Sequence, residues 1–278
     1  MSLYDADELR EMLASLGYQE PPMAMFYTDK EPEEGFTPKP GDLPTLEKEQ
    51  TGQVDWGQVF GNFSCILGHV WRARKKHSQA WLSAERFGCP GGAFYLGYIK
   101  PQTDTICAYV SSGFPGAMEG ERYISDPQTC RRIFEEIDPL PAAESYCVFK
   151  PLDLLGPDEI PELVIFFARP EVVAGLHTLT TFVTGDLNAV SSPFGAGCSH
   201  AVTFARSHAV QRERKAVLGG WDPSCRMYYK TDELSFSMPL ALFQDMLAKW
   251  RDSFLTTNTW KVCQKKIARS QKAWGEGE

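Results

Sequence analysis

Residues 162–168 read ELVIFFA, a run that is apolar throughout after its single glutamate. A strand with one solvated face alternates between apolar and polar residues, whereas a strand covered on both faces is apolar along its length. We therefore predict that residues 162–168 form a central strand of a sheet. Further strands are predicted at residues 21–27, 79–84, 107–111, 146–152 and 233–239.

Helices are predicted where apolar residues recur every three or four positions behind a start signal. Residues 170–186 begin with proline, which is favoured at the first helical position. In that helix the stripe from Val173 through Leu176 and Leu179 to Phe182 is predicted to face the core. The other predicted helices span residues 5–16, residues 63–76 with a start near Cys65, residues 126–137 and the segment after Pro239.

Predicted strands and helices interleave along the chain in two rough halves. This order favours an α+β or α/β fold, in which a mixed sheet is sandwiched by helices and two weakly similar halves are intertwined. We expect a single domain over residues 1–278. Residues 30–53 are rich in Pro, Glu, Gly and Lys and are predicted to be a surface excursion, and residues 251–278 a C-terminal helical extension.

Charge and hydropathy exclude several classes of protein. The net charge of −8 argues against a nucleic-acid partner, because neutralising phosphates requires clustered Lys and Arg. No apolar run approaches the roughly 20 residues that span a bilayer, so no membrane association is expected. The N-terminal residues are acidic where a secretory signal is basic and then apolar. We expect a cytoplasmic protein, in which the eight cysteines are not a disulfide framework.

Two short stretches place a cysteine in similar surroundings. Residues 87–97 read FGCPGGAFYLG, and residues 194–206 read FGAGCSHAVTFAR. Both Cys89 and Cys198 are predicted at the start of a helix, where the helix dipole and free backbone N–H groups favour a thiolate. A thiolate binds metals or attacks electrophiles. The alternative is that both cysteines pack as small apolar side chains.

A metal site in this chain requires ligands from distant segments. The sequence has no C-x-x-C pair of the kind that most structural zinc and iron–sulfur sites use. His200 follows Cys198 by two residues and is a candidate ligand or base, although a lone histidine is more often a hydrogen-bonded polar group. Arg226 adjoins Cys225 and is a candidate for binding an anion, although most arginines pair with surface carboxylates.

An ordered set of motifs resembles a known family. The set comprises PPMAMFY, NFSCILGHVWRARK, CPGGAFYLG, CVFKPL, ELVIFFARPEVVAGL, FGAGCSHAV and CRMYYKTDELSFSMP, and it extends over residues 9–250. In this order the motifs resemble the uncharacterised ArCR family, also called domain of unknown function 169, of archaea and many anaerobic bacteria. The resemblance implies no established activity. It implies shared cysteines at Cys65, Cys89, Cys198 and Cys225, and the anaerobic distribution favours iron–sulfur chemistry.

Three classes of function remain open. In the first, Cys65, Cys89, Cys198 and Cys225 converge to bind a [4Fe–4S] cluster, or alternatively zinc, in a redox or sensing role. In the second, Cys89 or Cys198 is the nucleophile of a cysteine-dependent enzyme, with His200 as base. In the third, the chain binds a ligand or partner without a cofactor, and its cysteines are structural. A small molecule or redox partner is expected, and self-association into a homo-oligomer stays open.

Overall fold

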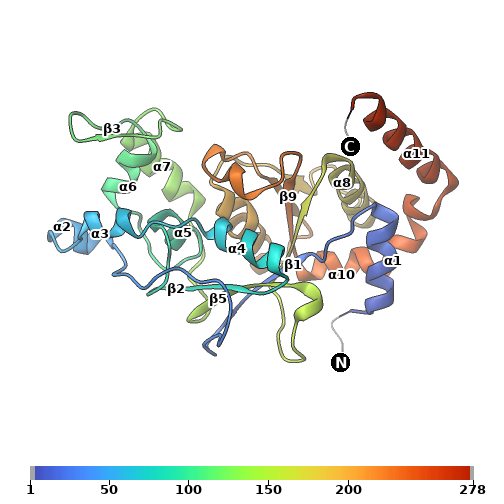
Figure 1. The fold of residues 1–278 in the computed structure, drawn as a ribbon, viewed down its shortest axis with the longest axis horizontal. Helices are drawn as coiled ribbons and strands as arrows, with labels where there is room; N and C mark the ends of the chain where they lie inside the picture. The colour runs from blue at the N-terminus through green and yellow to red at the C-terminus, as the bar shows by residue number, and fades with distance from the viewer. Residues whose placement is uncertain (1–3, 276–278) are drawn as a thin grey trace.

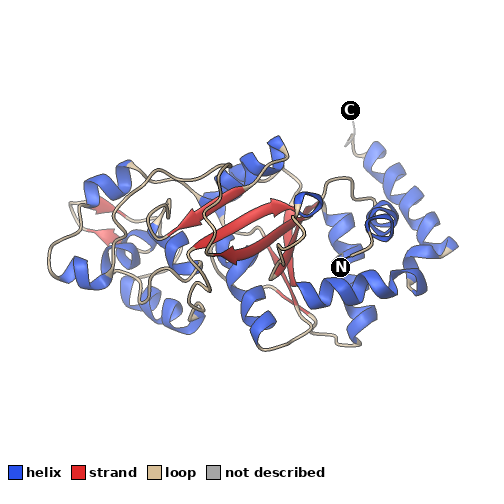
Figure 2. Cartoon of the chain, turned by 90° about the horizontal axis from the view of Figure 1, so that it is seen from below, coloured by secondary structure: helices blue, strands red, loops and turns tan. Residues whose placement is uncertain are grey.

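A mixed seven-stranded sheet forms the centre of the protein (Figures 1 and 2). The computed structural model describes residues 4–275. The strand order is β2-β5-β1-β6-β9-β8-β7, in which only the β7–β8 pair is parallel. The strands are β1 (Met23–Thr28), β2 (Ala80–Ser83), β5 (Tyr146–Pro151), β6 (Leu163–Ala168), β7 (Val190–Ser191), β8 (Ala216–Gly219) and β9 (Leu234–Pro239). A separate small hairpin pairs β3 (Gly113–Phe114) with β4 (Met118–Glu119).

Helices lie on both faces and at both ends of this sheet (Figure 2). The α-helices are α1 (Ala6–Leu16), α2 (Leu46–Gln50), α3 (Trp56–Gly61), α4 (Ile66–Lys76), α5 (Pro90–Tyr95), α6 (Asp104–Val110), α7 (Pro127–Ile137), α8 (Pro170–Thr184), α9 (Phe204–Val210), α10 (Leu240–Lys249) and α11 (Asn258–Ala273). A π-helical turn, η2 (Ser199–Thr203), precedes α9, and a 3₁₀ helix, η3 (Pro223–Tyr228), precedes β9. Among residues 4–275, no helix is long and apolar enough to cross a membrane.

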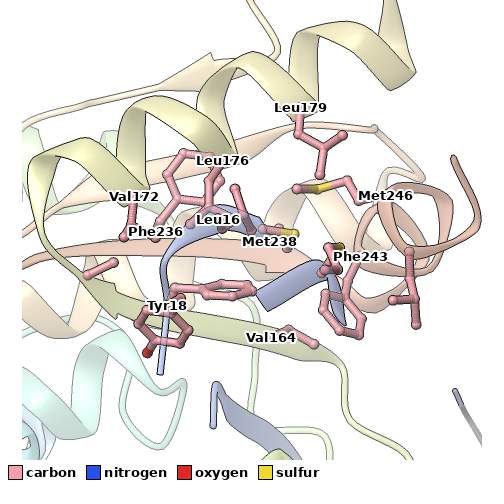
Figure 3. Close-up of a cluster of buried hydrophobic side chains, with 14 of the residues drawn as sticks. Leu16, Tyr18, Val164, Val172, Leu176, Leu179, Phe236, Met238, Phe243 and Met246 are labelled. Carbon is pink, nitrogen blue, oxygen red and sulfur yellow. The ribbon is translucent and has the colours of Figure 1, made fainter. Parts of the chain in front are cut away.

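The predicted central strand is confirmed, because β6 lies between β1 and β9. Its side chains alternate between two hydrophobic cores, one on each face of the sheet. Val164 and Phe166 contact the core formed with α1, α8 and α10, which is drawn in Figure 3. Ile165 and Phe167 contact the core formed with α4 and with the helix that contains η2 and α9. Burial on both faces explains why the sequence of β6 is apolar throughout.

A third hydrophobic cluster lies beyond the β2 side of the sheet. It is built from α5, α6 and α7, with Phe94, Tyr95, Ile106 and Phe134 among its buried side chains. Figure 1 shows these helices with α2, α3 and the β3–β4 hairpin at one end of the molecule, and α1, α8, α10 and α11 at the other. We refer to the end that contains α5, α6 and α7 as the α5–α7 lobe.

Two sequence predictions are wrong. Residues 107–111 were expected to form a strand but belong mostly to α6. The carboxylate of Glu49 accepts hydrogen bonds from the backbone N–H groups of Asp104 and Thr105, so a distant side chain caps this helix. Phe182 is expected to face the core, yet it is 47% exposed, because the core-facing side of α8 runs from Leu176 and Thr180 to Val183 and Phe182 lies beside it.

The amide protons of β6 are expected to be among the slowest to exchange with solvent. The strand is hydrogen-bonded on both sides and buried on both faces, so its exchange requires opening of the whole sheet. Hydrogen exchange followed by mass spectrometry tests this directly. Exchange of residues 163–168 as fast as that of the exposed helix α11 would contradict the observed strand order.

Candidate cysteine site

Cys65 and Cys89 begin two helices whose starts are tied together. Cys65 occupies the N-cap position of α4 without a side-chain capping hydrogen bond, and Cys89 caps α5 with its sulfur accepting a hydrogen bond from Gly92 N–H at 3.1 Å. Immediately before them, Ser64 N–H donates to the carbonyl of Gly88 at 3.0 Å. The predicted helix starts at both cysteines are confirmed, and this backbone hydrogen bond sets the two cysteines side by side.

Cys198 and Cys225 form a second pair that is tied in the same way. Cys198 lies in the first turn of the helix that continues through η2 and α9, and Cys225 lies in η3. The residue before Cys198, Gly197, donates its N–H to the carboxylate of Asp222 at 2.9 Å. A Cβ atom on Gly197 would lie only 2.4 Å from the sulfur of Cys225, so the missing side chain is what admits that sulfur.

The two pairs meet. A Cβ on Gly197 would also lie 2.5 Å from Leu67 of α4, two residues after Cys65. The hydroxyl of Thr203 in η2 donates to the carbonyl of Tyr95 in α5 at 2.8 Å. The starts of four helices from separate segments therefore lie close together. These contacts join residues that are more than a hundred positions apart in the sequence.

The pKa shifts of the cysteines also indicate that the four thiols lie near one another. Burial raises the pKa of the Cys198 thiol well above its ordinary value, and the nearby Cys89, Cys65 and Cys225 raise it further. Burial and Cys65 raise the pKa of Cys89 to about 12. Because these charge effects weaken with distance, the four thiols share one neighbourhood. We refer to Cys65, Cys89, Cys198 and Cys225 as the four-cysteine site.

The expected stabilisation of thiolates by helix starts is wrong for the protein without a bound cation. The hydrogen bond from Gly92 lowers the pKa of Cys89, and backbone N–H groups lower that of Cys65, but burial outweighs both effects. Burial and the carboxylate of Asp222 likewise raise the pKa of Cys225. A dipole of about half a charge does not offset desolvation together with several like charges.

Asp222 is a functional candidate that the sequence interpretation missed. Its carboxylate accepts hydrogen bonds from Gly197 and from the backbone and hydroxyl of Ser224, so it joins the segments of Cys198 and Cys225. Burial is the main reason that the pKa of all four thiols is raised, and the charge of Asp222 raises each of them further. The residues Asp-Pro-Ser before Cys225 are a helix-start signal. This signal would have predicted the capping role of Asp222.

The other two predicted site residues are engaged in local structure. His200 Nε2 lies 2.8 Å from the carbonyl oxygen of Pro193, and its ring packs 6.2 Å from that of Phe204. Arg226 donates to the carbonyl oxygens of four residues in the loop that follows β8: Gly220, Lys230, Thr231 and Glu233. The guanidinium therefore holds the loop that carries Cys225. A direct contact of either residue with a ligand stays a prediction.

The remaining four cysteines lie elsewhere. Cys147 is buried in β5, and Cys263 is exposed on α11. Cys107 of α6 and Cys130 of α7 are both buried in the α5–α7 lobe. All eight cysteines are free thiols.

Thiol sulfurs are ligands for both zinc and iron–sulfur clusters, and the four-cysteine site has the donor number that each requires. Within residues 4–275, no group of three or more His, Cys, Asp or Glu side chains is arranged to hold a metal ion. A zinc ion needs sulfurs about 4 Å apart, whereas ligands of a [4Fe–4S] cluster are separated by about 7 Å. The side chains as they stand are neighbours without forming a single-ion site.

The chain belongs to the uncharacterised ArCR family. The model of that family, a domain of unknown function, matches residues 11–249. The matched segment contains all seven strands of the main sheet and the whole four-cysteine site, but not α11. No curated protein and no solved structure matches the chain significantly.

Proposed function

We propose that the four-cysteine site binds a [4Fe–4S] cluster and gives the protein a redox or sensing role. The observation that carries this proposal is the convergence of four helix starts, each with one cysteine, from segments spread over 160 residues of sequence. Packing of a core does not require four thiols and a carboxylate at one place. A cluster does require four thiolates.

Charge supports a bound cation. The Asp222 carboxylate raises the pKa of all four thiols, and Cys65 also raises the pKa of Cys89, Cys198 and Cys225, so ionising the thiols together without a positive partner is unfavourable. A cluster iron supplies that positive charge and deprotonates a coordinating thiol outright. The backbone N–H groups at the helix starts then serve as donors to the sulfurs, as Gly92 already does to Cys89. When bound, the cluster would supply one-electron chemistry.

The spacing favours a cluster over zinc. The thiols are close enough to influence one another, yet the described residues hold no group arranged for one metal ion. A [4Fe–4S] cluster is wide enough to reach sulfurs about 7 Å apart, and a zinc ion is not.

A cysteine-dependent enzyme is the weaker alternative. The nucleophilic form of cysteine is the thiolate, and burial raises the pKa of Cys89 and Cys198 far above neutrality. The imidazole of His200 contacts the Pro193 carbonyl, and Cys198 feels the charges of the other cysteines and of Asp222. Among residues 4–275, no base is therefore placed to activate either thiol.

Purification without oxygen, followed by reconstitution with ferrous iron and sulfide, tests the proposal. We expect about four iron and four sulfide ions per chain, with a spectrum typical of [4Fe–4S] proteins. Stoichiometric zinc without iron would overturn the cluster in favour of the zinc alternative. Absence of any metal after reconstitution would leave only the structural interpretation of these cysteines.

Single substitutions to serine are expected to separate the two groups of cysteines. Cys89→Ser and Cys198→Ser each remove one thiolate ligand, so the iron content is expected to fall by more than half. Cys147→Ser is the matched control, because Cys147 is also buried but lies outside the four-cysteine site. Equal iron loss in Cys147→Ser would show that the effect comes from misfolding.

A further inference from the structure

A surface cavity lies between α11 and the ends of two other helices. It has a volume of about 150 Å³, and its walls are the C-terminal end of α1, the N-terminal end of α8 and one face of α11. Figure 1 shows these three helices together, at the end of the molecule opposite the α5–α7 lobe. The cysteines of the four-cysteine site belong to other elements, so the cavity is separate from that site.

The apolar wall of the cavity is held in place by hydrogen bonds. Trp260 of α11 donates its indole N–H to the carbonyl oxygen of Ser15 in α1 at 2.7 Å. Gln264, one turn further along α11, donates to the same carbonyl at 2.9 Å. The Trp260 ring lines the cavity together with Leu16 and Ile267. Because this wall is already in place, a ligand binds it without first ordering the side chains.

The polar wall of the cavity consists of an ion pair and an amide. The guanidinium of Arg169 lies 2.8 Å from a carboxylate oxygen of Glu171, and the side-chain amide of Gln271 donates to the same oxygen at 3.1 Å. The charge of Glu171 is therefore matched within the wall. The Arg169 side chain is 50% exposed, and a guanidinium has five N–H donors, so Arg169 can bind a second acceptor.

The helix that forms one wall is basic, although the protein as a whole carries a net charge of −8. The sequence of α11 contains five cationic residues and no acidic one. All five cationic side chains are exposed: Lys261, Lys265, Lys266, Arg269 and Lys272. Positive charges beside a cavity raise the local concentration of an anionic ligand, so the surroundings of this cavity favour an anion.

We propose that this cavity binds a small aromatic carboxylate, with its ring against Trp260 and Ile267 and its carboxylate on Arg169. An apolar cavity of about 150 Å³ holds a benzene molecule, so one aromatic ring is the right size. The planar guanidinium matches a carboxylate through two parallel hydrogen bonds. The cations of α11 offset the negative charge that the ligand adds beside Glu171.

The proposal concerns this chain and not its family as a whole. The family match ends at residue 249, and α11 begins at Asn258. It is also independent of the four-cysteine site. Ligand binding is therefore expected to be the same with and without iron and sulfide reconstitution, so the two proposals can fail separately.

Titration of the full-length protein with phenylacetate, 2-phenylacetamide and acetate, followed by NMR of the ligands, tests the proposal. We expect phenylacetate to bind with a Kd of about 1 mM or below. The amide keeps the ring but lacks the charge, so it is expected to bind about 10-fold more weakly. Acetate has the charge without the ring, and we expect no saturable binding. Added salt is expected to weaken binding of phenylacetate but not of the amide.

Two variants locate the bound ligand. Arg169→Gln is expected to weaken phenylacetate binding about 10-fold and to leave the amide within about 2-fold of its original affinity. Ala268→Phe places a ring in the cavity, so it is expected to abolish binding of both compounds. Arg10→Gln is the matched control, because it removes an exposed cation of α1 that does not line the cavity, and it is expected to leave binding unchanged.

Three results would count against the proposal. Equal affinities for phenylacetate and 2-phenylacetamide would show that the cavity does not recognise the negative charge. Full binding of phenylacetate by Ala268→Phe would place the ligand elsewhere on the protein. If phenylacetate, benzoate and indole-3-acetate all fail to bind at about 10 mM, the cavity is not a site for aromatic carboxylates.

Discussion

Replacing Gly197 with alanine is expected to push Cys225 out of the four-cysteine site and to abolish iron binding. The added Cβ would lie 2.4 Å from the Cys225 sulfur and 2.5 Å from Leu67 of α4, far inside van der Waals contact. Neither neighbour moves freely, because Cys225 is held in η3 and Leu67 is buried in a core. Overpacking of this kind typically destabilises a protein by about 1–3 kcal/mol.

Iron content after reconstitution and the midpoint of urea unfolding measure the two effects of Gly197→Ala. Gly91→Ala is the matched control, because Gly91 lies in the other cysteine motif and its added Cβ would meet nothing within 4 Å. That control is expected to retain iron and to be slightly more stable, since alanine favours helix over glycine. Full iron content in Gly197→Ala would mean that the four cysteines do not need their observed packing.

Arg74→Met is expected to lower the free energy of unfolding by about 3 kcal/mol, because it leaves a buried carboxylate without its main partner. The guanidinium of Arg74 on α4 donates to both oxygens of Glu233, at 3.0 and 3.2 Å. The two side chains are only 9% and 3% exposed. Arg74 also stacks over the ring of Phe167 in the central strand, at 4.2 Å.

Two further variants identify the cause of the Arg74→Met effect. The double variant Arg74→Met with Glu233→Gln removes the uncompensated charge, so it is expected to be less destabilised than the sum of the single changes. Arg10→Met breaks an exposed pair with Asp7, whose side chains are 75% and 78% exposed, and is expected to change stability by less than about 1 kcal/mol. Equal effects of Arg10→Met and Arg74→Met would show that burial of the ion pair is unimportant.

Much of the fold is readable from local pattern. The strands at β1, β2, β5, β6 and β9 were all expected from their apolar runs. The helix starts at Cys89 and Asp126 follow from the prolines that come next in the sequence, and the start near Cys65 follows from the apolar period of Ile66, Val70 and Ala73. These features depend on neighbours within a few residues, so the sequence alone contains the information that determines them.

The α6 helix shows where local pattern is insufficient. Its β-prone residues suggested a strand, and the helix is instead capped by Glu49, more than fifty residues away in the chain. The preference of a short segment for a strand is outweighed when a tertiary contact provides hydrogen-bond partners for the free N–H groups at the start of a helix. No window of sequence around residues 104–110 contains that information.

The same distinction applies to the four-cysteine site. The sequence by itself determined that helices begin at Cys65 and Cys89, because a helix start depends on residues within about one turn of it. Only the tertiary structure decided that Ser64 bonds to Gly88 and Gly197 to Asp222, which brings the four thiols together. It also decided the direction of their pKa shifts, because desolvation and neighbouring charges depend on what the whole fold packs around a sulfur, and at Cys89 they outweigh the local effect of the helix start.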